Sequence, residues 1–444
     1  MTSGDMRRVL PRGAARRGIQ GGMLPWSQGV GPCPTREREA GSEANVGRGK
    51  REAGSPSKLT AARMTGRPVQ WVEIDRSALI HNVTEFRRLI GAKRKMLAVV
   101  KANAYGHGLL EVARIVREAG ADWLGVNSLE EGITLLEAGQ ARPILILGYV
   151  PLDGIAEAVD RELRLVVYNE ETVARLAEAS RKLGKPAYLH FKLETGTNRQ
   201  GIPPEKITGF ISKARRFSGV VAEGISSHFA NIEDTTDHRY PKRQLEIYLS
   251  ALETLRIRGI RIPFRHMSCT AAVILFPDTW FNLVRVGIGL YGLWPSKETY
   301  LSCLEKRREP LSLRSVLSWK AKIAQIKKVP KDALIGYGCT YKTTRPTTLA
   351  VVPVGYYDGY ARSLSNSSYV LVKGRRAALQ GRVAMNFLTV DVTDIPGVGL
   401  EEEVTMIGSD GAEEISADSL ATLAGTISYE VLARINPFVP RIVV

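Results

Sequence analysis

The residue that most directly suggests chemistry is Lys101, which follows an apolar run from Leu97 to Val100. Such a run before a polar, glycine-containing segment is typical of a short buried strand that ends in a loop. A lysine desolvated at a strand end loses its charge readily, and its amine can then form a Schiff base with an aldehyde. Isolated lysines at strand ends more commonly reach to solvent. The chemical interpretation therefore depends on Tyr105, on His107 and on the rest of the chain.

The elements that must position this lysine follow a rhythm of apolar, strand-like runs separated by helical patterns. The helical segments, such as LLEVARIVREAG from Leu109, place apolar residues three or four apart and end at glycine. Eight such repeats over roughly 220 residues predict a (β/α)8 TIM barrel, since a doubly wound sheet rarely needs eight units. The predicted strands are Leu97–Val100, Trp123–Val126, Ile144–Leu147, Leu163–Val167, Ala187–Leu193, Val221–Ser226, Phe264–Met267 and Leu283–Ile288.

Polar residues collect where a barrel enzyme would carry its chemistry. Barrels of this class place their active sites at the carboxyl ends of the strands. The residues found at those ends are Lys101, Asn127, Tyr168, Glu194, His228, Ser268 and Arg285. Barrel and site are thus predicted together from the same pattern.

The stretch LAVVKANAYGHG, Leu97 to Gly108, resembles the pyridoxal-phosphate lysine signature of the alanine racemases, and the resemblance extends from about Val72 to the C-terminus. It implies a fold-type III pyridoxal-phosphate enzyme, an isomerase that interconverts L-alanine and D-alanine and supplies D-alanine for peptidoglycan in the cell wall. It also implies that Lys101 holds pyridoxal 5'-phosphate as a Schiff base and that Tyr105 contacts the phosphate.

A second base is implied by the segment IGYGCTY, which is similar to the family segment that carries a tyrosine opposite the lysine. Racemisation removes a proton from one face of Cα and returns one on the other, which two opposed bases do better than one. The resemblance implies that Tyr337 enters the barrel of the other subunit, so that a homodimer shares its active sites. Taken alone, a Gly-Tyr-Gly segment is more typical of a tight turn with an exposed ring.

The cofactor's remaining contacts are also implied by the resemblance. Arg285, in VRVGIGLYG, would meet the pyridine nitrogen, and because an arginine cannot hand over a proton, the ring would stay a poorer electron sink. His228 and Arg285 would be cationic neighbours that help the tyrosine act as a base. The family's phosphate positions, together with Tyr105, fall on Thr270, Gly287, Ile288 and Tyr429.

Substrate contacts follow from the same resemblance. Arg199 and the backbone N–H of Met385 are the expected donors to the substrate carboxylate, and Tyr356 is expected in the entryway and the substrate wall. A small pocket between Tyr356, Met385 and the cofactor would favour alanine. Lys192 matches a lysine that is carbamylated in some members of the family.

Three positions depart from the family pattern. Thr270 stands where serine is usual, Cys269 replaces the more usual asparagine near the cofactor oxygen, and Asn386 follows Met385 where aspartate is common. None of these changes removes a base or the Schiff-base lysine.

The chain of 444 residues is long enough for two domains and a tail. From about Pro295, alternating residues with Val, Thr, Gly and Pro predict a mostly antiparallel β-domain, followed by one helix from Ser416 to Ala424. The expected division is a disordered basic tail over residues 1–66, a cofactor-binding barrel over residues 67–300 and a β-domain over residues 301–444. Asp75 is the predicted N-cap of a helix over Arg76–Ile90, and Val69–Ile74 is a predicted strand.

The tail is rich in Gly, Arg, Ala, Ser and Pro, and its roughly 12 basic residues outnumber about 5 acidic ones. A secretory signal is not expected because no apolar segment follows Arg7 and Arg8. A transit peptide and a natural start at Met64 are alternative interpretations of this segment.

Charge and cysteine usage set further limits. The net charge of +17 is concentrated partly in the tail and forms no basic stripe interleaved with aromatic residues, so no nucleic-acid partner is expected. No run of 18 apolar residues predicts a membrane helix. The 4 cysteines lack a C-x-x-C pair, which argues against a metal site or a disulfide framework and favours a reducing, cytoplasmic location.

Four other functions stay open at this point. They are a broader-specificity amino-acid racemase, a non-catalytic pyridoxal-phosphate carrier, a pyridoxal-phosphate decarboxylase and nucleic-acid binding through the basic tail. The β-domain and Tyr337 argue against the carrier, and Arg285 argues against the decarboxylase, which would need an acidic group at the ring nitrogen.

Overall fold

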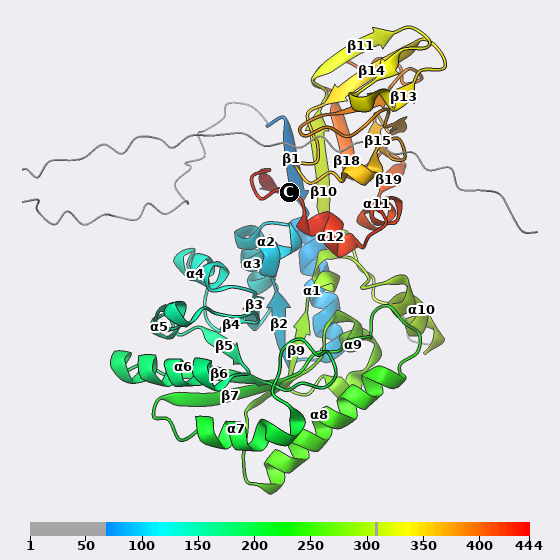
Figure 1. The fold of residues 1–444 in the computed structure, drawn as a ribbon. Coiled ribbons are helices and arrows are strands. Elements are labelled where there is room, and N and C mark those ends of the chain that lie inside the picture. Colours follow the sequence, from blue (N-terminus) through cyan, green and yellow to red (C-terminus); the bar gives the residue numbers. More distant parts are fainter. Residues whose placement is uncertain (1–67, 307–309) are drawn as a thin grey trace, which may run out of the picture. The chain divides into compact units, whose positions relative to one another are not determined.

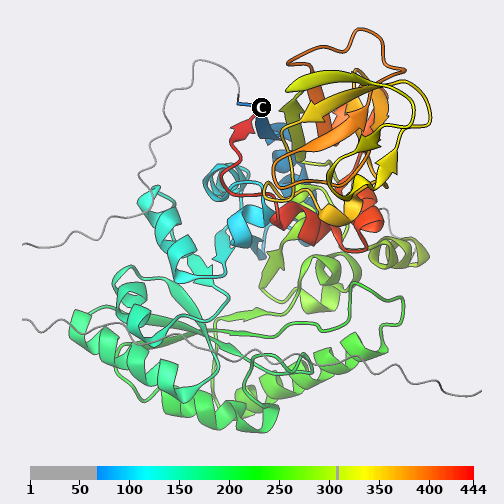
Figure 2. The same ribbon diagram turned by 45° about the horizontal axis from the view of Figure 1, so that its top comes forward.

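Eight parallel strands follow one another around the larger part of the fold (Figures 1 and 2). The computed structural model describes residues 68–306 and 310–444, and the expected tail over residues 1–66 lies outside them. The strands are β2 (Lys95–Val99), β3 (Trp123–Val126), β4 (Ile144–Ile146), β5 (Arg164–Val167), β6 (Ala187–Lys192), β7 (Val220–Ser226), β8 (Phe264–His266) and β9 (Leu283–Val286).

The ring order of these strands confirms the predicted barrel. Neighbouring strands pair in parallel from β2 through β8, and β9 returns to pair with β2. Between β8 and β9 the N–H of Arg285 donates to the carbonyl of Ser268 over 3.3 Å, which bridges the remaining gap. Leu97, Trp123 and Leu283 belong to a buried cluster contributed by several of these strands, so the strands surround a packed core and not a pore.

Helices cover the outside of the barrel, as Figures 1 and 2 show. The Asp75 carboxylate accepts the Ala78 N–H over 2.9 Å and begins the first helix where the sequence predicts it. The helices are α1 (Arg76–Ile90), α3 (Leu109–Glu118), α4 (Leu129–Glu137), α5 (Ile155–Asp160), α6 (Glu170–Leu183), α7 (Ile207–Ala214), α8 (Arg239–Ile257), α9 (Thr270–Leu275) and α10 (Lys297–Glu305). Within residues 68–306 and 310–444, none is long and apolar enough to cross a membrane.

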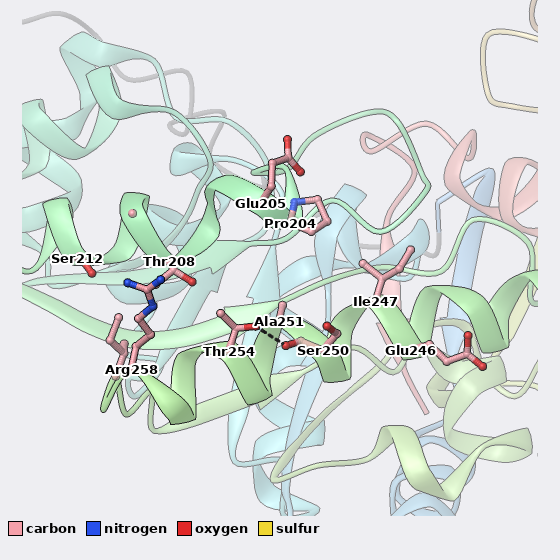
Figure 3. A pocket seen from close by; sticks show the side chains of 12 residues that line it. Pro204, Glu205, Thr208, Ser212, Glu246, Ile247, Ser250, Ala251, Thr254 and Arg258 are labelled. Carbon is pink, nitrogen blue, oxygen red and sulfur yellow. Dashed lines mark hydrogen bonds between the residues drawn. The ribbon is translucent and has the colours of Figure 1, made fainter.

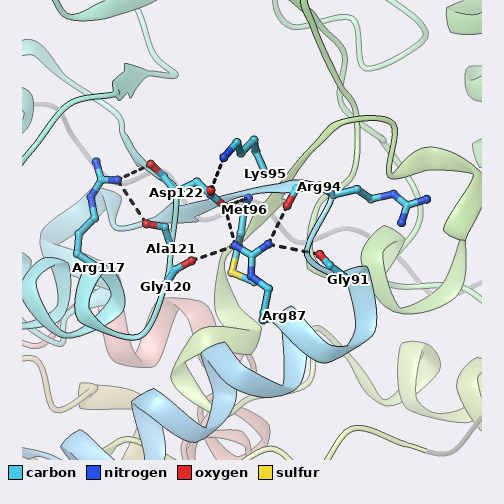
Figure 4. A network of polar contacts seen from close by, with 9 residues as sticks. All are labelled: Arg87, Gly91, Arg94, Lys95, Met96, Arg117, Gly120, Ala121 and Asp122. Atoms are coloured by element: carbon cyan, nitrogen blue, oxygen red, sulfur yellow. Dashed lines mark hydrogen bonds and ion pairs between the residues drawn. The ribbon is translucent and has the colours of Figure 1, made fainter.

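The amino ends of β2 and β3 are joined by charged residues (Figure 4). The Asp122 carboxylate accepts hydrogen bonds from Arg87 over 2.6 Å, from Lys95 over 2.9 Å and from the Met96 N–H over 2.9 Å. These partners lower the pKa of Asp122 against the opposing effect of its partial burial. Because this end of a barrel carries stability and not chemistry, we assign the network to the fold.

The remaining strands form the mostly antiparallel domain that the sequence predicts. One sheet has the order β16-β15-β18-β10-β1-β20, with β19 beside β18, and another has the order β11-β14-β17. Strands β12 and β13 form a separate pair. The strands are β10 (Leu317–Lys322), β11 (Gln325–Val329), β12 (Leu334–Ile335), β13 (Tyr341–Lys342), β14 (Thr347–Val352), β15 (Tyr369–Val372), β16 (Arg375–Ala378), β17 (Leu388–Asp391), β18 (Glu403–Asp410), β19 (Glu413–Ile415) and β20 (Arg441–Val443).

The first and last strands of the described chain meet in this domain. Strand β1 (Gln70–Ile74) pairs antiparallel with β10 and parallel with β20, so the N-terminal strand does not join the barrel. Two helices precede β20, α11 (Ala417–Ala424) and α12 (Ser428–Ala433), where the sequence analysis expects only one. Helix α12 has 6 residues, which is too short to show a helical period.

Candidate active site

Lys101 is followed by a turn of left-handed backbone, labelled α2 (Lys101–Tyr105) in Figure 1. The four residues Ala102–Tyr105 have φ angles of 55°, 53°, 52° and 53°. Left-handed backbone is costly for residues with a Cβ, and such strain is retained mainly at functional sites. The Asn103 side chain supports the turn by accepting the Leu109 N–H over 2.9 Å. The sequence predicts only a loop here, because alanine carries no signal for this conformation.

The Lys101 amine lies in an environment that favours its neutral form. Burial lowers the pKa of Lys101, and the positive charges of Arg199 and Arg285 lower it further, while Glu131 and Glu233 act in the opposite direction. A neutral amine is the form that can attack a carbonyl or accept a proton. Its burial and the charges around it are therefore compatible with the role that the sequence analysis gives to Lys101.

A group of hydroxyls and main-chain donors lies on the next elements of the barrel. The Gly287 N–H donates to Thr270 Oγ1 over 3.0 Å, and Ile288 begins the short helix η4 (Ile288–Tyr291). A Cβ on Gly287 would lie 2.6 Å from Tyr105 Oη, so glycine keeps the space beside that hydroxyl open. The Tyr105 ring lies 6.1 Å from the Tyr429 ring, centroid to centroid.

Arg285 is buried on β9 with its guanidinium enclosed by acceptors. It donates to His266 Nδ1 over 2.8 Å and to the carbonyls of Ser227 and Met267 over 2.9 and 3.0 Å. His228 Nδ1 lies 3.4 Å from the same guanidinium. Burial, followed by the charge of Arg285, holds the pKa of His228 well below its usual range, so this histidine is neutral. The expectation of a cationic His228 is therefore wrong, because a buried imidazole beside the Arg285 charge does not hold a proton.

Sequence reasoning did not find a chain of polar side chains that extends from Arg285 through the barrel interior. His266 Nε2 lies 2.8 Å from His190 Nδ1, and His190 Nε2 lies 3.1 Å from a Glu223 carboxylate oxygen. Glu223 in turn pairs with Arg164 over 3.4 Å. The sequence did carry a signal, since each of two predicted strands contains a histidine, His266 in FRH and His190 in YLHFK. Each histidine taken alone indicates only a buried core residue.

Glu233 is a further residue that the sequence analysis did not select. Its carboxylate accepts a hydrogen bond from Tyr429 Oη over 3.0 Å, and burial raises its pKa. Cys269, one of the departures from the family pattern, is also hydrogen-bonded to Glu233, and burial raises the pKa of its thiol to about 12. The thiol is therefore protonated and acts as a neutral neighbour of the site.

Arg199 lies on a loop that wraps around the Glu194 carboxylate. This carboxylate accepts the N–H groups of Gly196 and Thr197 over 2.6 and 2.7 Å. The Arg199 side chain is exposed, and its charge reaches Lys101 and Lys192. Burial, followed by the charges of Arg285 and Arg199, lowers the pKa of Lys192 to about 8. A cationic residue is thus available near the site for a substrate carboxylate.

Tyr337, Tyr356 and Met385 all belong to the β-domain. The Tyr356 N–H donates to the Ala384 carbonyl over 3.0 Å. Arg382, two residues before Ala384, lies close to Gly338, because a Cβ on Gly338 would be 2.8 Å from Arg382 Nη1. The three side chains are exposed by 76%, 43% and 54% respectively. No hydrogen bond within residues 68–306 and 310–444 of this single chain joins Tyr337 to Lys101.

A hollow of about 970 Å³ lies on the outside of the barrel, between α7 and α8 (Figure 3). Its lining includes Thr208, Ser250, Thr254 and Arg258, and the Thr254 hydroxyl donates to the Ser250 carbonyl over 2.9 Å. None of the residues at the carboxyl ends of the strands belongs to this lining, so the candidate site is the one around Lys101.

Comparison with known families shows to which family the chain belongs. The family model described as "Alanine racemase, N-terminal domain" matches residues 74–295, and "Alanine racemase, C-terminal domain" matches residues 316–443. The chain belongs to the alanine racemase family. The family resemblance in the sequence is thereby confirmed over both parts of the chain.

Individual members of the alanine racemase family agree with this assignment. The chain is 40% identical over 380 residues to an alanine racemase of Methanococcus maripaludis, covering 85% of this chain and 99% of that protein. The crystal structure of alanine racemase from Bacillus anthracis with bound L-Ala-P has a TM-score of 0.79 and 35% identity, covering 86% of this chain and 96% of that one. A histidine racemase from Leuconostoc mesenteroides is similar at a TM-score of 0.77 and 28% identity, covering 85% of this chain and 98% of that one.

Proposed function

We propose that this protein is an alanine racemase that interconverts L-alanine and D-alanine with pyridoxal 5'-phosphate. The observation that carries the proposal is a desolvated lysine, Lys101, directly before a left-handed turn at the mouth of a barrel, in a chain that matches alanine racemases over nearly their whole length. The racemase activity is an isomerase reaction that needs no external oxidant or reductant.

The donor set around Lys101 fits pyridoxal phosphate. Hydroxyls of Tyr105, Thr270 and Tyr429 and main-chain N–H groups near Gly287 and Ile288 suit a phosphate dianion, and Gly287 leaves the room that a side chain would fill. When bound, the cofactor withdraws electrons from the substrate Cα and so acidifies its proton. Lys101 would hold its aldehyde carbon.

Arg285 would set the electronic character of that chemistry. It would face the pyridine nitrogen as a donor, and its positive charge disfavours a proton on that nitrogen. By keeping that nitrogen unprotonated, Arg285 would favour return of the proton to Cα over side reactions. The neutral His228 and His266 beside Arg285 add no competing acid.

Two bases on opposite faces of Cα would then move the proton. Lys101 would serve one face and Tyr337 of the partner subunit would serve the other. The exposure of Tyr337 by 76%, together with the exposed side chains of Tyr356 and Met385, supports a partner-facing role for this part of the β-domain. The proposed assembly is accordingly a homodimer with shared active sites.

Substrate recognition is proposed to combine charge with a small volume. Arg199 and the Met385 N–H would bind the carboxylate, and Tyr356 would limit the side chain to a methyl group. The resulting D-alanine would serve peptidoglycan synthesis in the cytoplasm, with no nucleic-acid or membrane partner.

The deciding experiment measures the purified protein with L-alanine and added pyridoxal phosphate in deuterated water. Formation of D-alanine with deuterium at Cα is the expected result, because the proton is exchanged while Cα is acidified. Absence of both D-alanine and deuterium incorporation would refute the proposal. A release of carbon dioxide instead would indicate a decarboxylase.

A broader-specificity amino-acid racemase is the second candidate. It is favoured by the similarity of the chain to a histidine racemase at 28% identity. That relative is named for an amino acid larger than alanine. Chiral analysis of reactions with each common amino acid separates the two functions. Comparable rates with serine or basic amino acids would support the broader one.

A further inference from the structure

The side chain of Arg441, near the C-terminus, uses all of its hydrogen-bond donors on main-chain carbonyls. Two of them reach the Gly106 carbonyl, from Nε over 3.1 Å and from Nη2 over 2.8 Å. The other three reach Ile435, Asn436 and Val439, over 3.1, 2.7 and 2.5 Å. A guanidinium has five N–H donors, so this one is fully satisfied within the protein.

The acceptors belong to different parts of the site. Gly106 directly follows the left-handed turn Ala102–Tyr105, whereas Ile435 and Asn436 follow α12, which carries Tyr429. Arg441 itself lies on β20, which is paired with β1, so it is fixed to the sheet of the β-domain. One side chain therefore joins the Lys101 turn, the end of α12 and the β-domain.

The segment Gly106–Gly108 packs so closely against α12 and Arg441 that there is little room for a side chain at either glycine. A Cβ on Gly106 would lie 2.0 Å from the Leu432 carbonyl oxygen of α12, and a Cβ on Gly108 would lie 3.3 Å from Arg441 Cγ. Gly106 has a φ of 84° and Gly108 a φ of 102°, which glycine adopts at no steric cost. The two glycines therefore allow this segment to approach both α12 and Arg441 closely.

A second connection extends from Arg441 toward the Tyr356 loop. Asn436, whose carbonyl binds Arg441, donates its own N–H to the Asp358 carbonyl over 3.0 Å and its side-chain amide to the Tyr357 carbonyl over 3.0 Å. Arg441 thus stabilises a segment that also supports the proposed substrate wall.

We propose that Arg441 is a positioning residue of the racemase site, which fixes the turn carrying Lys101 and Tyr105 against the helix carrying Tyr429. The role deepens the proposed function and rests on it, since both tyrosines are proposed phosphate contacts. Burial lowers the pKa of Arg441 to about 10, with Glu111 opposing the effect, so the side chain stays charged near neutral pH. The bonds it makes are the strong, charge-assisted kind.

The test compares Arg441→Met, Arg441→Lys and a matched control, Arg434→Met. Arg434 lies just beyond α12, and its exposed side chain pairs with Glu430 over 3.0 Å. Arg441→Met is expected to raise the dissociation constant for pyridoxal phosphate by about ten- to hundredfold, because hydrogen bonds to a charged group are lost. Arg441→Lys should recover part of this loss, and Arg434→Met should leave affinity unchanged.

Hydrogen exchange of the cofactor-free protein supplies an independent measure. Faster exchange of the amides in residues 101–108 of Arg441→Met, but not of Arg434→Met, is expected if the guanidinium holds the turn. A lowered melting temperature with unchanged cofactor affinity and unchanged exchange in this segment would make Arg441 merely structural and overturn the proposal. If Arg441→Met does not fold, Arg441→Lys is measured in the same two assays.

A double-mutant cycle links Arg441 to the residue through which it is proposed to act. Tyr429→Phe removes the hydroxyl that Arg441 is proposed to position, so the combined variant should lose less affinity than the product of the two single losses. Losses that multiply would overturn the proposal. Failure of the unmutated protein to racemise alanine would refute the proposed function itself, which these affinity comparisons do not measure.

Discussion

The Arg285 guanidinium donates a hydrogen bond to His266 Nδ1 over 2.8 Å, which fixes the tautomer of that histidine. Because Nδ1 accepts, the ring proton of neutral His266 lies on Nε2 and is donated to His190 Nδ1 over 2.8 Å. His190 must then donate from Nε2 to Glu223 over 3.1 Å. The charge at the proposed ring-nitrogen position is thereby connected to a carboxylate on β7.

Substitution of His266 tests this arrangement. His266→Phe leaves a buried donor of Arg285 without its acceptor, so we expect a loss of about 1–3 kcal/mol in the free energy of unfolding. Urea unfolding monitored by circular dichroism measures the loss. The partly exposed His81, which contacts the Ser312 carbonyl, provides a control, and His81→Phe should cost less. Equal losses would show that the Arg285 contact contributes nothing particular.

Removal of the Lys101 amine should abolish both directions of the reaction. Lys101→Ala is expected to lose the visible absorption of the lysine-linked cofactor and to lower racemisation of either enantiomer by at least about a thousandfold. Absorption spectra and chiral chromatography measure the two effects. A variant that retains the covalent spectrum would place the cofactor on another lysine, with Lys192 the first to examine.

Tyr337→Phe should separate cofactor binding from proton transfer. We expect the spectrum of the bound cofactor to be unchanged while turnover falls by about a hundred- to ten-thousandfold, the usual contribution of a general base. Unchanged rates in both directions would exclude Tyr337 as the second base.

Shared active sites can be tested by mixing two inactive variants. If Tyr337 acts across a dimer, a hybrid of Lys101→Ala and Tyr337→Phe subunits has one site with both residues intact. Random reassociation should therefore restore about a quarter of the original activity. Each variant dissociated and reassociated alone is the control. No recovery in mixtures that demonstrably form hybrids would contradict the shared site.

The space beside Gly287 is expected to be needed for the cofactor. In Gly287→Ala the new Cβ would lie 2.6 Å from Tyr105 Oη, and the Tyr105 ring is packed against Tyr291 at 4.9 Å between centroids. We expect cofactor affinity to fall by about tenfold or more, as measured by equilibrium dialysis. Gly209→Ala is the control, because nothing lies within 4 Å of its Cβ position in α7.

Stability is expected to decline in mild acid because of the buried His107. Burial lowers the pKa of His107 from 6.5 to about 4 in the folded protein. Below about pH 6.5 the unfolded chain therefore binds a proton that the folded protein does not, and stability falls as the pH drops toward 4.

The substitution His107→Gln should flatten this decline while retaining a donor for the Tyr105 carbonyl, which lies 3.0 Å from His107 Nδ1. Melting temperatures measured from about pH 7 to about pH 5 test the expectation. His190, His228 and His266 also have lowered pKa values, so part of the acid sensitivity should remain. An identical decline in the variant would show that His107 does not contribute.

The sequence by itself determined the barrel, the β-domain and the position of Lys101 at a strand end. These features depend on apolar periodicity and on local signals such as the Asp75 cap, which neighbouring residues fix. The family resemblance selected the remaining site residues by their motifs. Their roles are still predictions that the experiments above address.

Only the tertiary structure decided how distant segments meet. Three features join residues that share no local pattern in the sequence. They are the left-handed turn after Lys101, the histidine chain from Arg285 and the hydrogen bonds from Arg441 to the Gly106 carbonyl. Buried donors and acceptors must be paired, and which partner satisfies each one depends on where the whole chain has folded. For this reason the sequence indicated the chemistry at Lys101, while the fold determined the contacts that hold it in place.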